Sequence, residues 1–473
     1  MRQGQMVGGS IDGKDAAPYV PDGFDEAIDA ERGPRGAYAE LLPALEELDL
    51  DQAADGIRDH LRTHGVDFKG DEGPEEFPLD VVPRVLSAAE WDELERGLRQ
   101  RARALNEFIR DTYTEQRIVR EGAIPTRVIE TSENLEPEMM GVEVRGQRAP
   151  VIGFDIVRGD DGAFRILEDN ALNPSGIAYA LAARTAIDAL VPLQPPTERR
   201  DIAFAVELLG RVLRAASPDG DDPSMALISE GEENGAWFEH VALAERLGIP
   251  IVDPEDLEVR DGRLYGAPSG EEPIALQVIY LRDNVAKLRD ENGDPTWQHE
   301  LLEPVRRGTL GTVSSFGSGV GDDKLTHAYS EELIRFYLGE EPIIPTVRTY
   351  DMAVTEAREQ VFERIDEMVV KPRAELGGRG VVIGKHATAE EREEVIRLAR
   401  ETPEDYVAQE TIRLSTHPTW CDGRLEPRHI DLRAYAYGEE IAPGGLTRVA
   451  LERGSLIVNS TQGGGAKDTW VLA

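Results

Sequence analysis

Apolar residues recur at helical spacing along the first third of the chain. The longest run of this kind comprises Trp91, Leu94, Leu98, Leu105 and Phe108. Such spacing places its members on one face of a helix, which packs against the rest of the protein. Ser87 and Glu90 have the spacing of a capping box, which starts a helix. We therefore predict a helix from Ser87 to about Asp111, preceded by a helical stretch over residues 37–64.

Charged residues fall between the apolar positions of this helix. Arg101, Arg103 and Asp111 are the clearest cases. Charged side chains are rarely buried without a partner, so we predict that all three lie on the solvated face and belong to no site.

Two-residue alternation replaces the helical period near the middle of the chain. Residues 151–157 and 164–170 read as two strands joined by a turn at Gly162. Ser175 follows in a turn and is the predicted N-cap of a helix that continues through Ala189. A helix N-terminus placed beside a phosphate site would also help to bind anions.

From about residue 218 strands and helices alternate, which is typical of a small α/β domain. Later strands are expected where apolar residues alternate between glycine-rich turns. The predicted strands after residue 218 are 225–229, 249–252, 257–265 as a hairpin, 275–281, 368–371, 381–384, 406–410, 431–437 and 447–450. The predicted fold class is α/β (α+β). The glycine-rich stretch 317–324 lacks the Gly-Lys-Ser/Thr of a Walker loop and is predicted to be a plain turn.

The chain is strongly acidic. Its 473 residues include 91 Asp and Glu against 52 Lys and Arg, a net charge of -39. Such a surface repels phosphate backbones, so we expect no nucleic-acid partner. We hypothesise a cytosol of very high salt, where screening relieves the repulsion between carboxylates. An ordinary acidic protein is the alternative.

Cysteine content and hydropathy place further limits on the protein. Cys421 is the single cysteine, so no intrachain disulfide and no cysteine-rich metal site is expected. No apolar run reaches the roughly 18 to 20 residues of a membrane span, and the N-terminus lacks an apolar signal core. We therefore expect a cytoplasmic protein without a membrane partner.

Oxygen-bearing side chains gather on the strands at residues 151–170. Glu168 and Asn170 are two apart and share a face, and Asp155 lies on the neighbouring strand. Carboxylate and amide oxygens suit Mg²⁺, which usually keeps positions for water and substrate phosphates. The trio is a candidate site for a magnesium nucleotide. A hairpin with polar edge residues is the alternative.

Lys371 ends a predicted buried strand and precedes a glycine-rich loop. Gly377, Gly378 and Gly380 lie in that loop, between two strands. Such a hairpin can fold over phosphates with its backbone N–H groups, while the lysine supplies a positive charge. Glycine also simply marks turns, so this motif alone does not decide between the two interpretations.

Two arginines and a polar strand end complete the candidate set. Arg433 and Arg448 lie on predicted neighbouring strands and suit phosphate or carboxylate binding, with surface ion pairs as the alternative. Gln409 and Glu410 end an apolar strand, as an adenine-binding hinge would. Lys467 is either a second cationic contact or a loop charge.

Several segments together resemble ATP-grasp ligases. They are KPRAELGGRGVVIG, VAQETIRLS, DLRAYAYG, GGLTRVALERGSLIVNSTQGGGAKDTW and FDIVRGDDGAFRILEDNALNPSG. The segment with Asp155 and Glu168 precedes the lysine segment here, whereas ordinary ATP-grasp chains have it last. The chain is therefore similar to the circularly permuted ATP-grasp family of type 2, over about residues 77–470. The stretch 274–290 departs from the family pattern, so no substrate role is expected for Arg282 or Asp283.

This resemblance implies a circularly permuted ATP-grasp fold and a role for each candidate residue. Asp155, Glu168 and Asn170 would hold Mg²⁺, with Mn²⁺ as an alternative. The other implied roles are ATP phosphate binding by Lys371, Gly377, Gly378 and Gly380, adenine binding by Gln409 and Glu410, phosphate or acyl-phosphate binding by Arg433 and Arg448, and a further metal or phosphate contact by Asn459.

The implied domain organisation follows the same order. It comprises a flexible acidic arm over 1–25, a mostly helical region over 26–150, a metal-binding segment over 151–217, a small pre-ATP-grasp-like α/β domain over 218–325 and nucleotide-binding segments over 326–473.

The implied activity is ATP-dependent joining of a carboxylate to an amine through an acyl phosphate, giving ADP and phosphate. The substrates would be small molecules or peptides, and the oligomeric state is left open. A non-catalytic nucleotide-binding scaffold and a substrate-independent ATP hydrolase are the alternatives.

Overall fold

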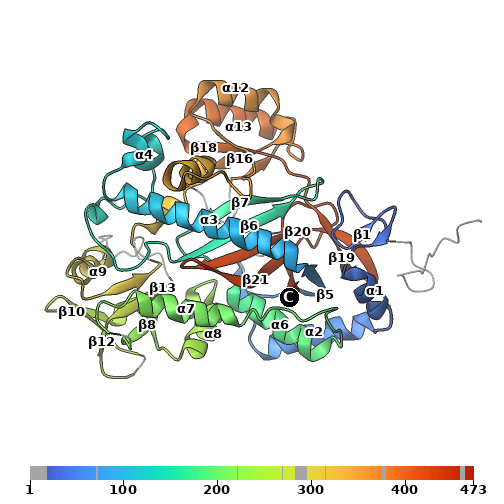
Figure 1. Cartoon of the computed structure of the whole chain (residues 1–473), viewed down its shortest axis with the longest axis horizontal. Helices are drawn as coiled ribbons and strands as arrows, with labels where there is room; N and C mark the ends of the chain where they lie inside the picture. The colour runs from blue at the N-terminus through green and yellow to red at the C-terminus, as the bar shows by residue number, and fades with distance from the viewer. Residues whose placement is uncertain are drawn as a thin grey trace, which may run out of the picture.

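A central antiparallel sheet with one parallel pair organises the computed structural model (Figure 1). The structure describes residues 19–70, 73–220, 222–268, 270–282, 296–314, 316–374, 380–458 and 464–473. Within these residues the strand order is β5-β22-β21-β20-β6-β7, and β19 pairs with β20. The strands are β5 (Leu79–Leu86), β22 (Gly465–Val471), β21 (Glu440–Val449), β20 (Arg424–Tyr437), β6 (Val151–Arg158), β7 (Phe164–Asn170) and β19 (Thr416–Cys421).

Helices cover both faces of the central sheet. The long helix α3 (Ala88–Thr112) crosses one face and packs its apolar side against Leu432 and Ala434 of β20. Helices α6 (Ile177–Leu190) and α7 (Phe204–Ala215) pack on the other face with Tyr435 and Tyr437. Successive residues of β20 therefore serve two separate cores, as strand alternation requires.

The helix predicted from Ser87 is confirmed. Ser87 accepts the Glu90 backbone N–H, and the Glu90 side chain accepts the Ser87 N–H, so both halves of the capping box are present. The helical stretch predicted over 37–64 is divided into α1 (Tyr38–Glu46) and α2 (Leu50–Thr63). Asp49 caps the second helix by accepting the Gln52 N–H, which explains the break between the two helices.

The prediction that Arg101 and Asp111 lie on a solvated face is wrong. Arg101 is 2% exposed and binds the buried Asp169 carboxylate of β7. Asp111 is 3% exposed and accepts the Tyr337 hydroxyl hydrogen. Arg103 is exposed, as predicted. Partners far away in sequence compensate the cost of burying these two charges, and helical spacing alone carries no information about such partners.

The small α/β domain contains a four-stranded parallel sheet of order β14-β13-β8-β9. Its elements are β8 (Met225–Ile228), α8 (Trp237–Leu247), β9 (Ile251–Val252), β13 (Val278–Leu281), α9 (Thr296–Arg306) and β14 (Gly311–Val313). The predicted hairpin is also present, in a separate antiparallel sheet of β10 (Leu257–Arg260), β11 (Arg263–Gly266) and β12 (Ile274–Leu276). The strand predicted over residues 275–281 is thus divided between two sheets.

A second antiparallel sheet lies at the top of Figure 1 and is called the upper sheet below. Its order is β15-β18-β16-β17, and α12 and α13 cover its outer face. The elements are β15 (Thr349–Asp351), α12 (Thr355–Glu363), β16 (Met368–Pro372), β17 (Val382–Ile383), α13 (Ala389–Glu401) and β18 (Tyr406–Glu410). The predicted strands at 368–371, 381–384 and 406–410 therefore form one sheet.

Shorter elements connect these layers. They are β1 (Ile28–Asp29), β2 (Gly33–Pro34), β3 (Asp67–Gly70), β4 (Gly73–Glu76), α4 (Arg117–Arg120), α5 (Arg127–Glu130), α10 (Lys324–Ala328) and α11 (Ser330–Leu333). Among the described residues, no helix has the length and apolar character needed to cross a membrane.

Candidate active site

The β6–β7 hairpin sets the predicted metal ligands side by side. Asp155 lies directly opposite Glu168, and Gly153 lies directly opposite Asn170. Cross-strand partners share a face, so the two carboxylates and the amide project from the same side of the central sheet. The Asn170 Nδ2 group donates to the Gly153 carbonyl at 3.4 Å.

Both predicted arginines reach the Asp155 carboxylate. Arg433 donates from Nε to Oδ1 at 2.6 Å and from Nη2 to Oδ2 at 2.8 Å, and Nη2 of Arg448 lies 2.9 Å from Oδ2. Arg448 also pairs with Asp431, its neighbour across the β20–β21 ladder. Burial alone raises the pKa of Asp155, but the two guanidinium charges outweigh burial and hold that pKa well below its usual range.

The arginine contacts limit what Asp155 offers to a metal. A carboxylate has about four lone-pair positions, and the guanidinium groups occupy three of them. Glu168 differs, because its carboxylate accepts no hydrogen bond from any described residue. Across the described ranges, no group of three or more His, Cys, Asp or Glu side chains is arranged to hold a metal ion. Any metal here would need further oxygen ligands from outside these side chains.

Lys371 on β16 faces this group from the upper sheet. Its ammonium donates to the Gln409 side-chain oxygen, and the Gln409 amide nitrogen donates to the Leu167 carbonyl at 3.1 Å and to the Thr349 hydroxyl at 3.0 Å. Burial lowers the pKa of Lys371, while the nearby Glu168 charge acts in the opposite direction. Gln409 thus ties the upper sheet to β7 and holds the lysine, using both ends of its side-chain amide.

The remaining predicted nucleotide contacts have different environments. Glu410 accepts the Tyr350 hydroxyl hydrogen at 2.9 Å and an Arg364 N–H at 3.4 Å. Gly380 has a φ of +68°, a conformation that favours glycine. The predicted residues Gly377, Gly378, Asn459 and Asp283 lie outside the described residues.

Sequence reasoning missed Asp322 and Lys324, which belong to the stretch predicted to be a plain turn. Asp322 accepts the backbone N–H groups of Ala171 and Leu172, directly after β7. Burial raises its pKa to about 6, and the Glu168 charge adds to the increase. Lys324 acts on the pKa values of both Asp322 and Lys371, which places its charge in the same cluster. The signal in the sequence was the Asp-Asp-Lys that follows the glycines.

The predicted N-cap of α6 is wrong. Gly176 occupies the N-cap position and makes no side-chain cap, whereas Ser175 lies one residue before it. Glu239 of α8 instead accepts the N–H groups of Gly176 and Ala178. A buried carboxylate therefore already occupies this helix N-terminus, so a phosphate does not find it free.

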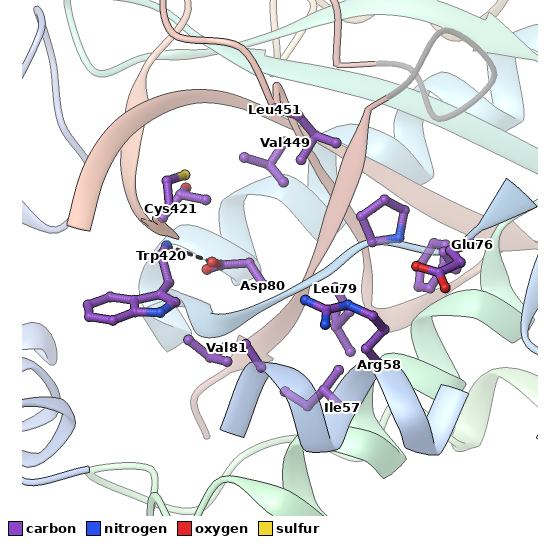
Figure 2. Close-up of a pocket in the computed structure, with 14 residues that line it drawn as sticks. Ile57, Arg58, Glu76, Leu79, Asp80, Val81, Trp420, Cys421, Val449 and Leu451 are labelled. Carbon is purple, nitrogen blue, oxygen red and sulfur yellow. Dashed lines mark hydrogen bonds between the residues drawn. The ribbon is translucent and has the colours of Figure 1, made fainter. Parts of the chain in front are cut away.

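Lys467 does not lie in a loop. It is fully buried in β22, where its ammonium pairs with Asp80 and donates to the Pro418 carbonyl at 2.9 Å. Beside this pair, a cavity of about 200 Å³ opens between α2 and the β19–β20 hairpin, and the Trp420 N–H donates to Asp80 across its wall (Figure 2). The buried contacts of Lys467 support the structural interpretation of this residue.

A larger cavity of about 560 Å³ lies at one end of the upper sheet. Its walls include Glu367, Lys385, Thr411 and Leu456. Glu367 directly precedes β16, Thr411 directly follows β18, and the Thr411 N–H donates to the Glu367 carbonyl at 2.8 Å. The cavity therefore lies at the end of β16 opposite the glycine-rich stretch that follows Pro372.

Comparison with known proteins agrees with this architecture. A family model for circularly permuted ATP-grasp type 2 proteins matches residues 83–450. An uncharacterised protein of Mycobacterium tuberculosis is 40% identical over 467 residues, covering 95% of this chain and 84% of that protein. A Frankia casuarinae protein provisionally named glutamate–cysteine ligase 2-2 is 38% identical over 467 residues, covering 96% of this chain. The present chain spans about half, 54%, of the length of that Frankia relative.

A solved structure is similar in fold. The glutathione synthetase-like effector of Globodera pallida, in its apo form, superposes with a TM-score of 0.56 at 10% sequence identity. The match covers 89% of this chain and 97% of the effector. At this identity the likeness concerns the fold alone.

Proposed function

Since the chain belongs to the circularly permuted ATP-grasp type 2 family, we propose that it is an ATP-dependent ligase that joins a carboxylate to an amine. The observation that carries this proposal is the meeting of Lys371 from the upper sheet with Glu168 from the central sheet. Arg433 and Arg448 adjoin them through Asp155. Phosphoryl transfer is catalysed mainly by positioning and charge neutralisation, which is what such a group supplies.

The donor set fits MgATP. The Glu168 carboxylate and the Asn170 amide oxygen are the ligand types that Mg²⁺ or Mn²⁺ accepts, and nucleotide phosphates would complete the coordination. Asp155 would contribute its remaining lone pair while it holds the two arginines. The bound ion would neutralise charge on the transferring phosphoryl group. Lys371 and Lys324 would hold the phosphates from the opposite side.

The two ends of β16 suggest how ATP lies. The glycine stretch with Gly377, Gly378 and Gly380 would cover the phosphates, next to Lys371. The 560 Å³ cavity at the other end, beside Glu410 and Thr411, is large enough for a nucleoside. We therefore propose that adenine lies in this cavity. Gln409 would act by fixing Lys371 instead of contacting the base through its own amide.

The proposed reaction proceeds in two displacements. A substrate carboxylate oxygen attacks the γ-phosphorus of ATP, and ADP leaves. The amine then attacks the acyl carbon, and phosphate leaves with the formation of an amide. Arg433 and Arg448 would bind the phosphoryl and acyl-phosphate oxygens, since guanidinium groups match such oxyanions. The name of the Frankia relative and the fold of the glutathione synthetase-like effector support amino-acid or peptide substrates.

Product analysis tests the proposal. Wild-type protein is incubated with MgATP and a panel of amino-acid and peptide carboxylates, each with and without amines, while ADP and phosphate are measured. The proposal expects release that requires a carboxylate and an amine together. Phosphate release that needs neither would identify an ATP hydrolase. Nucleotide binding without any release would favour the scaffold alternative.

A further inference from the structure

The turn after β7 holds Arg433 from a second side. The Ser175 carbonyl accepts the Tyr435 hydroxyl hydrogen at 2.9 Å and an Nη1 hydrogen of Arg433 at 3.5 Å. Gly176 follows with a φ of +120°, and a Cβ there would lie 2.3 Å from the Tyr435 hydroxyl oxygen. The position of the Ser175 carbonyl therefore depends on the backbone path of this turn.

The small α/β domain fixes that backbone path. Glu239 on α8 accepts the Gly176 N–H at 2.7 Å and the Ala178 N–H at 3.0 Å through one carboxylate oxygen. Arg282, directly after β13, donates to the other Glu239 oxygen at 2.9 Å and to the Pro174 carbonyl at 3.0 Å. The pair thus binds the turn on both sides of Ser175.

The pair is deeply buried and comes from two separate elements of the small domain. The Glu239 side chain is 0% exposed and the Arg282 side chain is 2% exposed. Arg282 also donates to the Tyr280 hydroxyl at 3.1 Å. Charged hydrogen bonds in such an environment are geometrically restrictive, because an unpaired buried charge is costly. A displacement of the small domain would consequently displace the turn.

We propose that Glu239 and Arg282 are positioning residues for Arg433, so that the small α/β domain sets the geometry of the phosphate-binding arginine. This inference rests on the nucleotide site proposed above. Neither residue contacts the proposed phosphate position. Each acts through the turn at Pro174–Ala178, whose Ser175 carbonyl orients the guanidinium group.

A purely stabilising ion pair makes a different prediction. Loss of such a pair lowers the amount of folded protein, but each folded molecule binds nucleotides as before. A positioning pair instead changes the preference for ATP over ADP, because Arg433 would contact the γ-phosphoryl group that ADP lacks. The ratio of the two affinities is independent of the folded fraction, so it separates the two roles.

The experiment is titration calorimetry of the full chain with MgATP and with MgADP. The test variants are Glu239→Gln, which leaves Arg282 without a charged partner, and Tyr435→Phe, which removes one contact to Ser175 without disturbing a buried charge. Arg433→Gln gives the value for complete loss of the guanidinium. Glu245→Gln is the matched control, because Glu245 is an exposed carboxylate on the same helix α8.

We expect the ATP/ADP affinity ratio to fall about 10-fold in Glu239→Gln and in Arg433→Gln, the scale of one charged hydrogen bond. A smaller fall in the same direction is expected for Tyr435→Phe, and none for Glu245→Gln. An unchanged ratio in both Glu239→Gln and Tyr435→Phe would overturn the positioning role and leave the proposed nucleotide site intact. Wild-type protein that binds neither nucleotide would overturn both.

Discussion

Arg433 on β20 and Asp155 on β6 are cross-strand neighbours joined by two hydrogen bonds of 2.6 and 2.8 Å. The side chain of Asp155 is 4% exposed and that of Arg433 is 17% exposed. With Arg448 and Asp431, they form a buried group of alternating charge. The pairing keeps two guanidinium groups charged and oriented beside Glu168, which is the arrangement that oxyanion binding requires.

Replacing Asp155 by Asn is expected to destabilise the protein. The change removes the carboxylate partner of Arg433 and Arg448, and breaking a buried ion pair on one side typically costs about 3–5 kcal/mol. Urea denaturation followed by circular dichroism measures this loss. Asp161→Asn is the matched control, because Asp161 pairs with Arg165 in the same hairpin but is 54% exposed. The control should lose less than about 1 kcal/mol, and equal losses in the two variants would contradict the account.

Replacing Lys371 by Met is expected to weaken MgATP binding about 10- to 100-fold, because the variant loses a charged contact to the phosphates. Isothermal titration calorimetry gives this value directly. Adenosine serves as the control ligand, since it lacks phosphates and should bind wild type and variant alike. Equal loss for adenosine would show that Lys371 supports the fold of the site and not the phosphates.

Glu136 provides a test of pH dependence. Burial raises its pKa to about 7 from an ordinary value of 4.5. The unfolded chain therefore releases this proton at lower pH than the folded chain. The contribution of the group to stability is present below about pH 4.5 and is lost as pH rises through about 7.

Glu136→Gln removes this loss, so the variant should be more stable than wild type above pH 7, by at most about 3 kcal/mol. The difference should vanish near pH 4. Thermal melts of both proteins across this range measure it, and Glu133→Gln is the control at a nearby exposed carboxylate. A difference that grows as the pH falls would contradict the assignment.

The net charge of -39 predicts a dependence on salt. At low ionic strength the carboxylates repel one another, and multimolar KCl reduces the screening length to about 3 Å or less. If the protein is adapted to a high-salt cytosol, its melting temperature should rise from low to multimolar KCl. A higher melting temperature at low salt would contradict that adaptation and favour the ordinary acidic alternative.

Local patterns predicted the elements of the fold well. Ser87 and Glu90 defined the start of α3, and alternation around Gly162 defined the β6–β7 hairpin. Both signals act within a few residues of sequence, where capping and turn geometry are decided. The ordering of the motifs allowed the permuted ATP-grasp fold to be predicted, and the family match bears this out.

Long-range partners decided what the sequence could not show. Ser175 has a typical N-cap residue type, yet Glu239, 63 residues from Gly176, supplies the carboxylate at α6. Arg101 resembled a surface charge because its partner Asp169 lies on β7, 68 residues away. Pairings of this kind depend on how sheets and helices pack. They leave no periodic trace in the sequence of either partner.

The most direct test of the central claim is the melting temperature with ATP, with and without Mg²⁺, for wild type and Glu168→Gln. ATP at about 100 times its dissociation constant should stabilise wild type by roughly 2.7 kcal/mol. The account predicts that this shift requires Mg²⁺, is lost in Glu168→Gln, and persists in a Glu133→Gln control. An equal shift in Glu168→Gln, or no shift in wild type, would contradict a magnesium nucleotide site at Glu168.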